Sequence, residues 1–131
     1  MWPFRRRRPA PDGSVLLGEA STDPAGYDVL TVSEHRFPET YAALWEAAAE
    51  DERAARRILT VATLVPVPDA QFGVADMEVR LGGQLAGYLR PPHLGRVAQA
   101  IDAARAVEAE APALVEWGPV GPTTRLRLSL P

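Results

Sequence analysis

The sequence predicts a small α+β domain built on a mostly antiparallel, partly open β-barrel with two amphipathic helices. Two observations carry this prediction. Short segments rich in β-branched and aromatic residues alternate between apolar and polar positions and are separated by glycine and proline turns. Two longer segments change to a helical period of 3.6 residues. Because the strands outnumber the helices and do not alternate with them, a barrel is favoured over a parallel βαβ sheet.

The length of 131 residues suits a single domain with one core, which we place at residues 14–131. The preceding segment, residues 1–13, contains Trp2, Phe4 and the run Arg5–Arg8, and its prolines and glycine prevent regular structure. We predict a disordered, arginine-rich arm here. The alternative is an arm that contacts an anionic surface, either a membrane or a nucleic acid.

The expected secondary structure follows the order β-β-α-β-β-β-α-β-β. The strands are expected at residues 14–19, 27–33, 57–67, 76–81, 85–89, 113–117 and 125–130, and the helices at residues 37–56 and 93–110. This number of short strands makes an OB- or SH3-like barrel the favoured architecture.

Prolines and glycines set the expected ends of several elements. The third strand is apolar on both faces, which is typical of a central strand, and Pro66 and Pro68 are expected to end it. Gly82 and Gly83 are expected to form a two-residue hairpin turn, because glycine accepts positive φ without steric cost. Pro112 is expected to end the second helix.

The charge is distributed unevenly along the chain. The formal net charge is −3, but residues 1–10 carry four arginines and no acid, so the rest of the chain, with ten arginines against seventeen acids, sums to −7. An acidic body does not favour phosphate binding over its whole surface, so a nucleic-acid site would be a local patch. There is no cysteine and no run of about 18 apolar residues, so we expect a cytoplasmic protein that is not integral to a membrane.

The residue types that usually carry catalysis or metal binding are sparse. His35 and His93 are the only histidines, and without cysteine they lack enough partners for a metal site. The glycines of the predicted hairpin do not lie between a strand and a helix, so they do not form a phosphate-binding loop. We therefore expect no enzyme activity, no cofactor and no metal.

Aromatic and arginine side chains at predicted loop positions are the remaining functional signal. Arg36 and Phe37 lie between a strand and a helix, Phe72 lies in a loop, and Arg90 precedes the second helix. Small barrels hold unstacked bases on exposed aromatic rings beside arginine, so these four residues are candidates for binding single-stranded nucleic acid. The alternative is structural: Phe37 packs against its own helix, and Phe72 fills an end of the barrel.

The segment 64–89 resembles the core of a HIRAN domain, a module found fused to some helicases and as a stand-alone bacterial protein. Phe72 stands in the place of the family's tyrosine, and upstream Glu34 and Phe37 fall where the family has an acid and an aromatic residue. The other residues that carry the resemblance are Pro66, Pro68, Asp69, Val79 and the closing segment Ala86–Leu89. The resemblance covers about residues 28–130 and implies a divergent HIRAN-type barrel.

HIRAN domains that bind the 3′ end of single-stranded DNA are understood to hold a base between aromatic side chains. The resemblance therefore implies that Phe37 and Phe72 stack on a base while Arg36 and Arg90 meet phosphate. Such domains are also understood to sense the DNA terminus with polar residues of the loop motif.

Three loop residues depart from that pattern, because Ala70, Gly73 and Ala75 replace the polar residues. A stacking platform would survive these changes, whereas recognition of a terminal hydroxyl would not. Two hypotheses follow. The first is a non-catalytic module that binds single-stranded DNA or DNA ends. The second is a divergent protein-interaction or structural domain that does not bind nucleic acid and whose partner is a protein.

Overall fold

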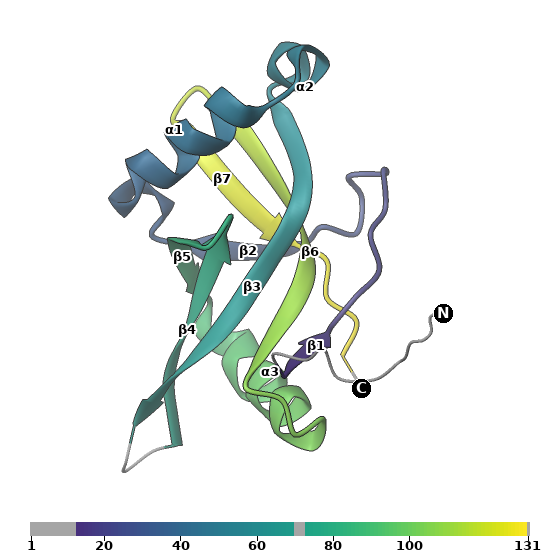
Figure 1. Cartoon of the computed structure of the whole chain (residues 1–131), viewed down its shortest axis with the longest axis vertical. Coiled ribbons are helices and arrows are strands. Elements are labelled where there is room, and N and C mark those ends of the chain that lie inside the picture. The colour runs from purple at the N-terminus through teal and green to yellow at the C-terminus, as the bar shows by residue number, and fades with distance from the viewer. Residues whose placement is uncertain (1–12, 70–72, 131) are drawn as a thin grey trace.

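The computed structural model describes residues 13–69 and 73–130 (Figure 1). The order of strands and helices matches the predicted order, except that two helices replace the first predicted one. The predicted arm, apart from Gly13, lies outside the described residues, as does Phe72. The described elements are β1 (Ser14–Leu16), β2 (Val29–Val32), the 3-10 helix η1 (Glu34–Arg36), α1 (Pro38–Ala47), α2 (Glu50–Ala55), β3 (Arg57–Asp69), β4 (Gly73–Leu81), β5 (Gln84–Leu89), α3 (Pro91–Ala103), β6 (Glu108–Gly118) and β7 (Gly121–Leu126).

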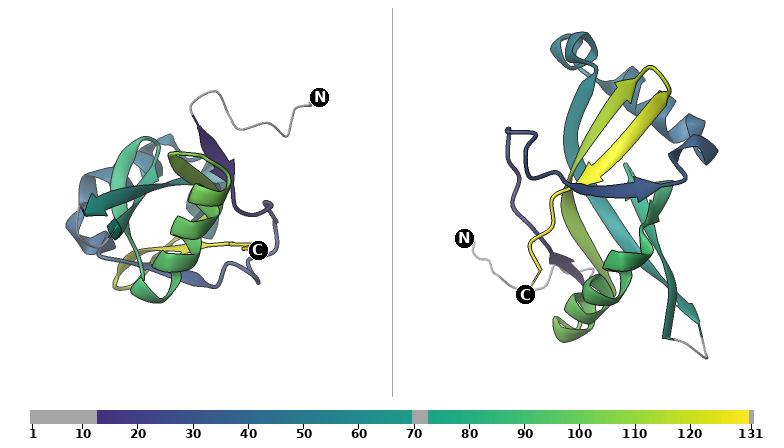
Figure 2. Two further views of the ribbon diagram at one scale, coloured as in Figure 1. Left: turned by 90° about the horizontal axis from the view of Figure 1, so that it is seen from below. Right: turned by 180° about the vertical axis from the view of Figure 1, so that it is seen from behind.

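The strands close into a barrel. Over residues 13–69 and 73–130 they pair in the order β1-β6-β3-β4-β5-β2-β7, and a further pairing of β6 with β7 joins a ring of six strands. The pairings in the ring are antiparallel, whereas β1 is an additional strand that pairs with β6 in parallel. Seen from below, the ring surrounds a central interior (Figure 2). The predicted fold class, a small OB-like barrel with helices, is confirmed.

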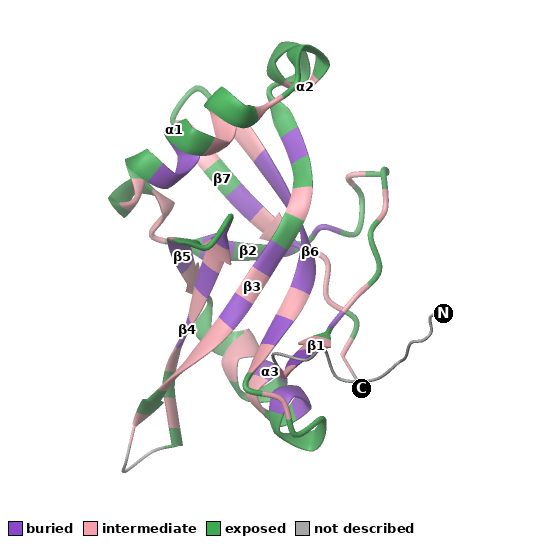
Figure 3. Cartoon of the chain, in the orientation of Figure 1, coloured by how far each residue is buried: buried purple, intermediate pink, exposed green. Residues whose placement is uncertain are grey.

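The inside of the barrel holds the core (Figure 3). On β4, Met77, Val79 and Leu81 point inward in the predicted alternation, and each is at most 1% exposed. Helix α3 adds Val97 and Ile101 to the same core and covers one end of the barrel (Figure 2). The predicted hairpin turn at residues 82–83 is confirmed, with φ values of 59° and 81° for its two glycines.

The first predicted helix is interrupted, so the expectation of one continuous helix is wrong. The chain is extended at Ala48 and Ala49, with ψ values of 150° and 163°. Side chains satisfy the backbone groups on both sides of this break. Glu52 accepts the N–H of Ala49 at 2.9 Å, and Arg53 donates to the carbonyls of Trp45 and Glu46 at the end of α1. These caps reduce the cost of ending one helix and beginning another.

Three prolines that were expected to end elements lie inside strands. β3 continues through Pro66 and Pro68 to Asp69, and β6 passes through Pro112. Proline has no N–H to donate, so it fits where the strand ladder does not need one. The Pro112 carbonyl accepts the N–H of Arg127, on the side of β6 that faces away from β3. Because the two backbone groups of a strand residue point the same way, the Pro112 ring interrupts no β3–β6 hydrogen bond.

Pro66 likewise lies at a position of β3 where no neighbouring strand needs an N–H. The pairing of β3 with β6 stops at Leu64 and Ala109. The carbonyl of Arg56 accepts the N–H of Trp117, so even-numbered residues direct their backbone groups toward the β6 side. Pro66 therefore faces an edge with which no further strand pairs in the described part of the chain. A proline there blocks the addition of another strand.

β3 is a central strand, as predicted, because it lies between β6 and β4. The burial on both faces that is typical of a central strand is, however, absent in its first half. Ile58 and Ala62 are 8% and 0% exposed, whereas Leu59 and Val61 are 40% and 51% exposed. Ile58 and Ala62 point toward the inside of the closed barrel. Leu59 and Val61 lie on its outer surface, where closure of the ring leaves them partly uncovered.

Replacement of Gly87 tests the contact between β2 and β5. A Cβ at residue 87 would lie 2.7 Å from the carbonyl oxygen of Val32, a backbone atom that cannot move without breaking the β2–β5 pairing. We expect Gly87→Ala to lower the free energy of unfolding by roughly 1–3 kcal/mol, measured by urea denaturation.

Gly95→Ala is the matched control, since nothing lies within 4 Å of its added Cβ on α3. It should stabilise the protein by about 0.5–1 kcal/mol, because glycine is unfavourable inside a helix. Equal unfolding midpoints for the two variants would contradict this view of the β2–β5 contact.

Candidate functional site

The candidate site lies where β2 leads into η1 beside the end of β5. Val32, the last residue of β2, pairs with Tyr88 of β5. Ser33 follows with a left-handed φ of 71°, which turns the chain out of the strand and into η1. This turn places Arg36 and Phe37 next to β5, although these elements are separated by about fifty residues of sequence.

Arg36, Phe37 and Tyr88 form a surface cluster, which we call the arginine–aromatic cluster. The guanidinium carbon of Arg36 lies 5.6 Å from the ring centroid of Phe37 and 5.9 Å from that of Tyr88. The two ring centroids are 6.1 Å apart, with an interplanar angle of 55°. Arg36 is exposed and both rings are half-buried. The arrangement is a cation at the surface over two aromatic rings.

Hydrogen bonds attach the first turn of α1 to β5. The hydroxyl of Thr40 donates to the carbonyl of Leu85 at 2.7 Å. The hydroxyl of Tyr41 donates to the carbonyl of Ala86 at 3.0 Å and lies 2.7 Å from the hydroxyl of Thr124. Because a tyrosine has one hydroxyl proton, Thr124 is the donor in this last contact. These bonds hold the start of α1, and hence Phe37, against β5.

A further contact attaches η1 to β7. The carboxylate of Glu34 accepts the backbone N–H of Thr124 at 3.0 Å.

Burial raises the pKa of the Tyr41 hydroxyl above its ordinary value, the hydrogen bond from Thr124 lowers it in part, and the Glu34 carboxylate raises it further. Tyr41 therefore stays neutral over the whole physiological range and acts as a hydrogen-bonding junction.

The charges around the cluster nearly balance. Glu78 pairs with Tyr88 across the β4–β5 ladder, and its carboxylate forms an ion pair with Arg80 at 2.7 Å. Glu39, in the first turn of α1, is exposed. Arg90 is exposed two residues after Tyr88 and has no ion-pair partner within the ranges that the structure describes. Any attraction of an anion to this site therefore depends chiefly on the two arginines, 36 and 90.

The structure places three of the four predicted site residues near one another, and the fourth lies outside the described residues. Arg36 and Phe37 are adjacent at the surface, and Arg90 follows the end of β5, two residues after Tyr88. Phe72 lies outside the described residues, so its role stays a prediction. Tyr88 was not among the predicted site residues, although it belongs to the closing segment of the HIRAN resemblance.

A second arginine–aromatic group has a structural role. Trp45 and Trp117 meet edge to face, with ring centroids 5.2 Å apart. Arg53 donates to the carbonyl of Trp45, and Arg56 donates to the carbonyl of Trp117. Both guanidinium groups are therefore used to satisfy backbone oxygens beside the tryptophan pair.

Residues 13–69 and 73–130 contain neither a cluster of metal-ligating side chains nor a membrane-spanning helix. Within these ranges, no three His, Cys, Asp or Glu side chains gather closely enough to hold a metal ion. His35 is exposed on η1, and His93 is half-buried in the first turn of α3. None of the helices in this part of the chain combines the length and the hydropathy of a membrane-spanning segment.

Comparison with protein-family models, with curated proteins and with solved structures gives no match to this chain. The fold and the arginine–aromatic cluster are therefore the observations from which function is inferred.

The buried Tyr41 hydroxyl predicts a specific alkaline sensitivity. Tyrosine in the unfolded chain ionises near pH 10, whereas the raised pKa keeps folded Tyr41 protonated at that pH. The stability that neutral Tyr41 contributes is therefore fully present below about pH 10 and is lost as the pH rises further, by at most about 1.4 kcal/mol per pH unit. Tyr41→Phe should lower the free energy of unfolding at pH 7 by about 1–3 kcal/mol, because Thr124 and Ala86 lose a partner.

The difference in unfolding free energy between the natural chain and Tyr41→Phe should stay constant from about pH 7 to 9 and shrink above about pH 10. Urea denaturation at each pH measures this difference, and contributions from the other titrating groups cancel in it. A difference that is unchanged at about pH 11 would show that Tyr41 ionises without opposition from burial.

Proposed function

We propose that this domain is a non-catalytic module that binds single-stranded nucleic acid, with one base stacked on the arginine–aromatic cluster. The observation that carries the proposal is the exposed guanidinium of Arg36, which lies over the rings of Phe37 and Tyr88. Planar guanidinium and aromatic groups are the surfaces on which proteins stack unpaired bases. Arg90, near the same strand end, supplies the phosphate contact.

A single strand fits this site better than a duplex. The chain outside residues 1–10 sums to −7, so an extended phosphate surface would be repelled over most of the domain. A base that is already unpaired can reach the rings of Phe37 and Tyr88, whereas a duplex keeps its bases stacked inside. Stacking is worth about 1–3 kcal/mol per base, which is enough to oppose a weak general repulsion.

The resemblance to HIRAN domains supports the same proposal. In that family aromatic side chains hold a base, and Phe37 stands in one of those aromatic positions. Ala70, Gly73 and Ala75 stand where the family has polar residues, so the groups that would read a terminal hydroxyl are missing. We therefore propose that binding does not require a free 3′ end.

A protein-interaction domain is the second candidate, and a different observation favours it. Leu30 and Val32 on the outer face of β2 are 43% and 37% exposed, and Val32 pairs with Tyr88. Apolar side chains beside an aromatic cluster also suit a protein partner. This candidate predicts no affinity for nucleic acid that depends on salt.

Fluorescence anisotropy of a labelled single-stranded oligonucleotide separates the two candidates. Substitution of Arg36, Phe37 or Tyr88 by alanine should weaken binding by roughly fivefold to 150-fold, the equivalent of about 1–3 kcal/mol per stacked base. With two arginines at the site, the logarithm of the association constant should fall with the logarithm of salt concentration with a slope of roughly −1.4. Oligonucleotides with free and blocked 3′ ends should bind equally.

Two controls separate the barrel from the arm. Arg105→Ala removes an exposed arginine that lies after α3 and should leave the affinity unchanged. Replacement of Arg5–Arg8 by serine in the full chain removes the charge of the arm alone. If that change abolishes binding while Phe37→Ala and Tyr88→Ala do not, the barrel is not the binding surface.

A further inference from the structure

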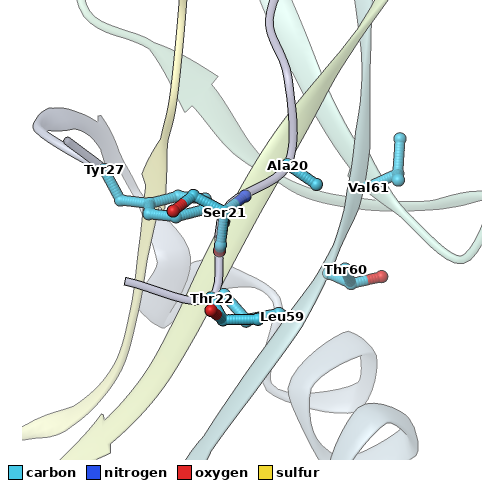
Figure 4. A pocket seen from close by; sticks show the side chains of 7 residues that line it. All are labelled: Ala20, Ser21, Thr22, Tyr27, Leu59, Thr60 and Val61. Atoms are coloured by element: carbon cyan, nitrogen blue, oxygen red, sulfur yellow. Dashed lines mark hydrogen bonds between the residues drawn. The ribbon is translucent and has the colours of Figure 1, made fainter. Parts of the chain in front are cut away.

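An apolar depression lies on the outer surface of the barrel, separate from the arginine–aromatic cluster. It has a volume of about 270 Å³ and lies between β3 and the segment that precedes Tyr27 (Figure 4). Leu59 and Val61 of β3 form its floor, and they are 40% and 51% exposed. Ala20 and Thr22 line the opposite side. Two large apolar side chains are therefore left partly uncovered at one place.

The wall of the depression is held in place by hydrogen bonds. Tyr27 is only 2% exposed, and its hydroxyl donates to the carbonyl of Ser21 at 2.8 Å and accepts the N–H of Ser21 at 3.1 Å. The carboxylate of Asp23 accepts the N–H of Ala25, which closes the turn. The depression is consequently a built feature of the fold.

The segment that forms one wall of the depression is acidic, and we call its exposed carboxylates the acidic rim. Glu19, Asp23 and Asp28 are exposed on the wall segment, and residues 17–28 contain no basic residue. One guanidinium, that of Arg127, lies beside Gly26, so the three carboxylates outnumber the positive charge on this wall. On the opposite side, Arg57 of β3 lies 3.5 Å from the carboxylate of Glu116. A ligand suited to this surface would combine apolar side chains with positive charge.

Residues 1–12 have that combination. Trp2 and Phe4 are followed directly by Arg5–Arg8, and the arm carries four of the fourteen basic residues of the chain. We propose that residues 1–12 dock on their own domain, with Trp2 or Phe4 in the depression and Arg5–Arg8 facing the acidic rim. The proposal concerns a surface distinct from the proposed base-stacking site.

The length of the chain permits this docking. The carbonyl of Gly13 accepts the N–H of Val107, which fixes the point where the described chain begins. Ala20 follows Gly13 by seven residues, so it lies at most about 25 Å away. Phe4 precedes Gly13 by nine residues, which span up to about 30 Å when extended. Phe4 can therefore reach the depression.

The connection also favours the arm of the same chain over other occupants. A tethered ligand is present at an effective concentration on the order of millimolar, far above the concentration of a second copy in dilute solution. Contact with Leu59 and Val61 would remove apolar surface from water. The four positive charges would oppose part of the −7 carried by the rest of the chain.

A nitroxide label on the full-length chain tests the proposal. The chain has no cysteine, so Pro3→Cys provides a single attachment point between Trp2 and Phe4. In the ¹⁵N-labelled protein we expect the label to broaden the amide signals of Thr22 and Val61 and to leave that of Tyr88 unaffected. Broadening centred on Tyr88, or no broadening in either region, would overturn the proposal.

A mixed sample distinguishes the arm of the same chain from that of a second copy. Nitroxide-labelled chain without ¹⁵N is mixed with unlabelled ¹⁵N chain, so only contacts between copies broaden the signals. We expect no broadening in this mixture. If the Thr22 and Val61 signals broaden, the occupant is the arm of another copy, and docking within one chain is refuted.

Surface variants test whether the depression is the place where the arm docks. Val61→Lys adds a positive charge to the floor and should abolish the broadening at Thr22. Val120→Lys is the matched control, since Val120 is 97% exposed in the β6–β7 turn and does not line the depression.

A second measurement uses a chain without a label. The double variant Trp2→Ser/Phe4→Ser should shift the amide signals of Thr22 and Val61 but not that of Val120. Unchanged signals in this double variant would also refute the proposal.

Discussion

The hydroxyl of Tyr41 is the junction on which the arrangement of the candidate site depends. It joins helix α1 to two strands, through the carbonyl of Ala86 on β5 and the hydroxyl of Thr124 on β7. Both bonds are buried, where a hydrogen bond is electrostatically stronger and an unpaired polar group is costly. The start of α1 therefore has one favourable position on the barrel. Because Phe37 is the residue before α1, its ring is directed toward Tyr88 by contacts that lie inside the protein.

Barrel closure explains which parts of the structure could be predicted from the sequence. On β4, Met77, Val79 and Leu81 alternate with polar residues because one face meets the core and the other meets solvent, so a local pattern reports the structure. The effect of Pro66 or Pro112 depends instead on whether a neighbouring strand needs an N–H at that position. That information is contained in the pairing of distant strands, and a local sequence pattern cannot supply it.

The break between α1 and α2 and the composition of the site also depend on contacts that a local sequence pattern does not report. The break is stabilised by Glu52 and Arg53, whose side chains bond backbone groups that a continuous helix would have satisfied internally. Arg36 and Phe37 were predictable because they are adjacent in the sequence. Tyr88 joins them only through the register of β2 with β5. A usable signal was nevertheless present: when one residue of a strand points inward, the residue before it points outward, and an outward tyrosine near a barrel end is a candidate contact residue.

Electrostatics connects the two proposed surfaces. A base at the arginine–aromatic cluster brings phosphate toward a body that carries −7 outside residues 1–10. An arm held against Glu19, Asp23 and Asp28 would place four positive charges on that body and reduce its repulsion of the phosphate. A nucleic acid that instead attracted Arg5–Arg8 would have to separate them from the acidic rim, so its binding and arm docking would oppose each other. Linkage requires the same coupling free energy in both directions. The sign of that coupling therefore decides whether the arm assists the stacking site or competes with the domain for the same polyanion.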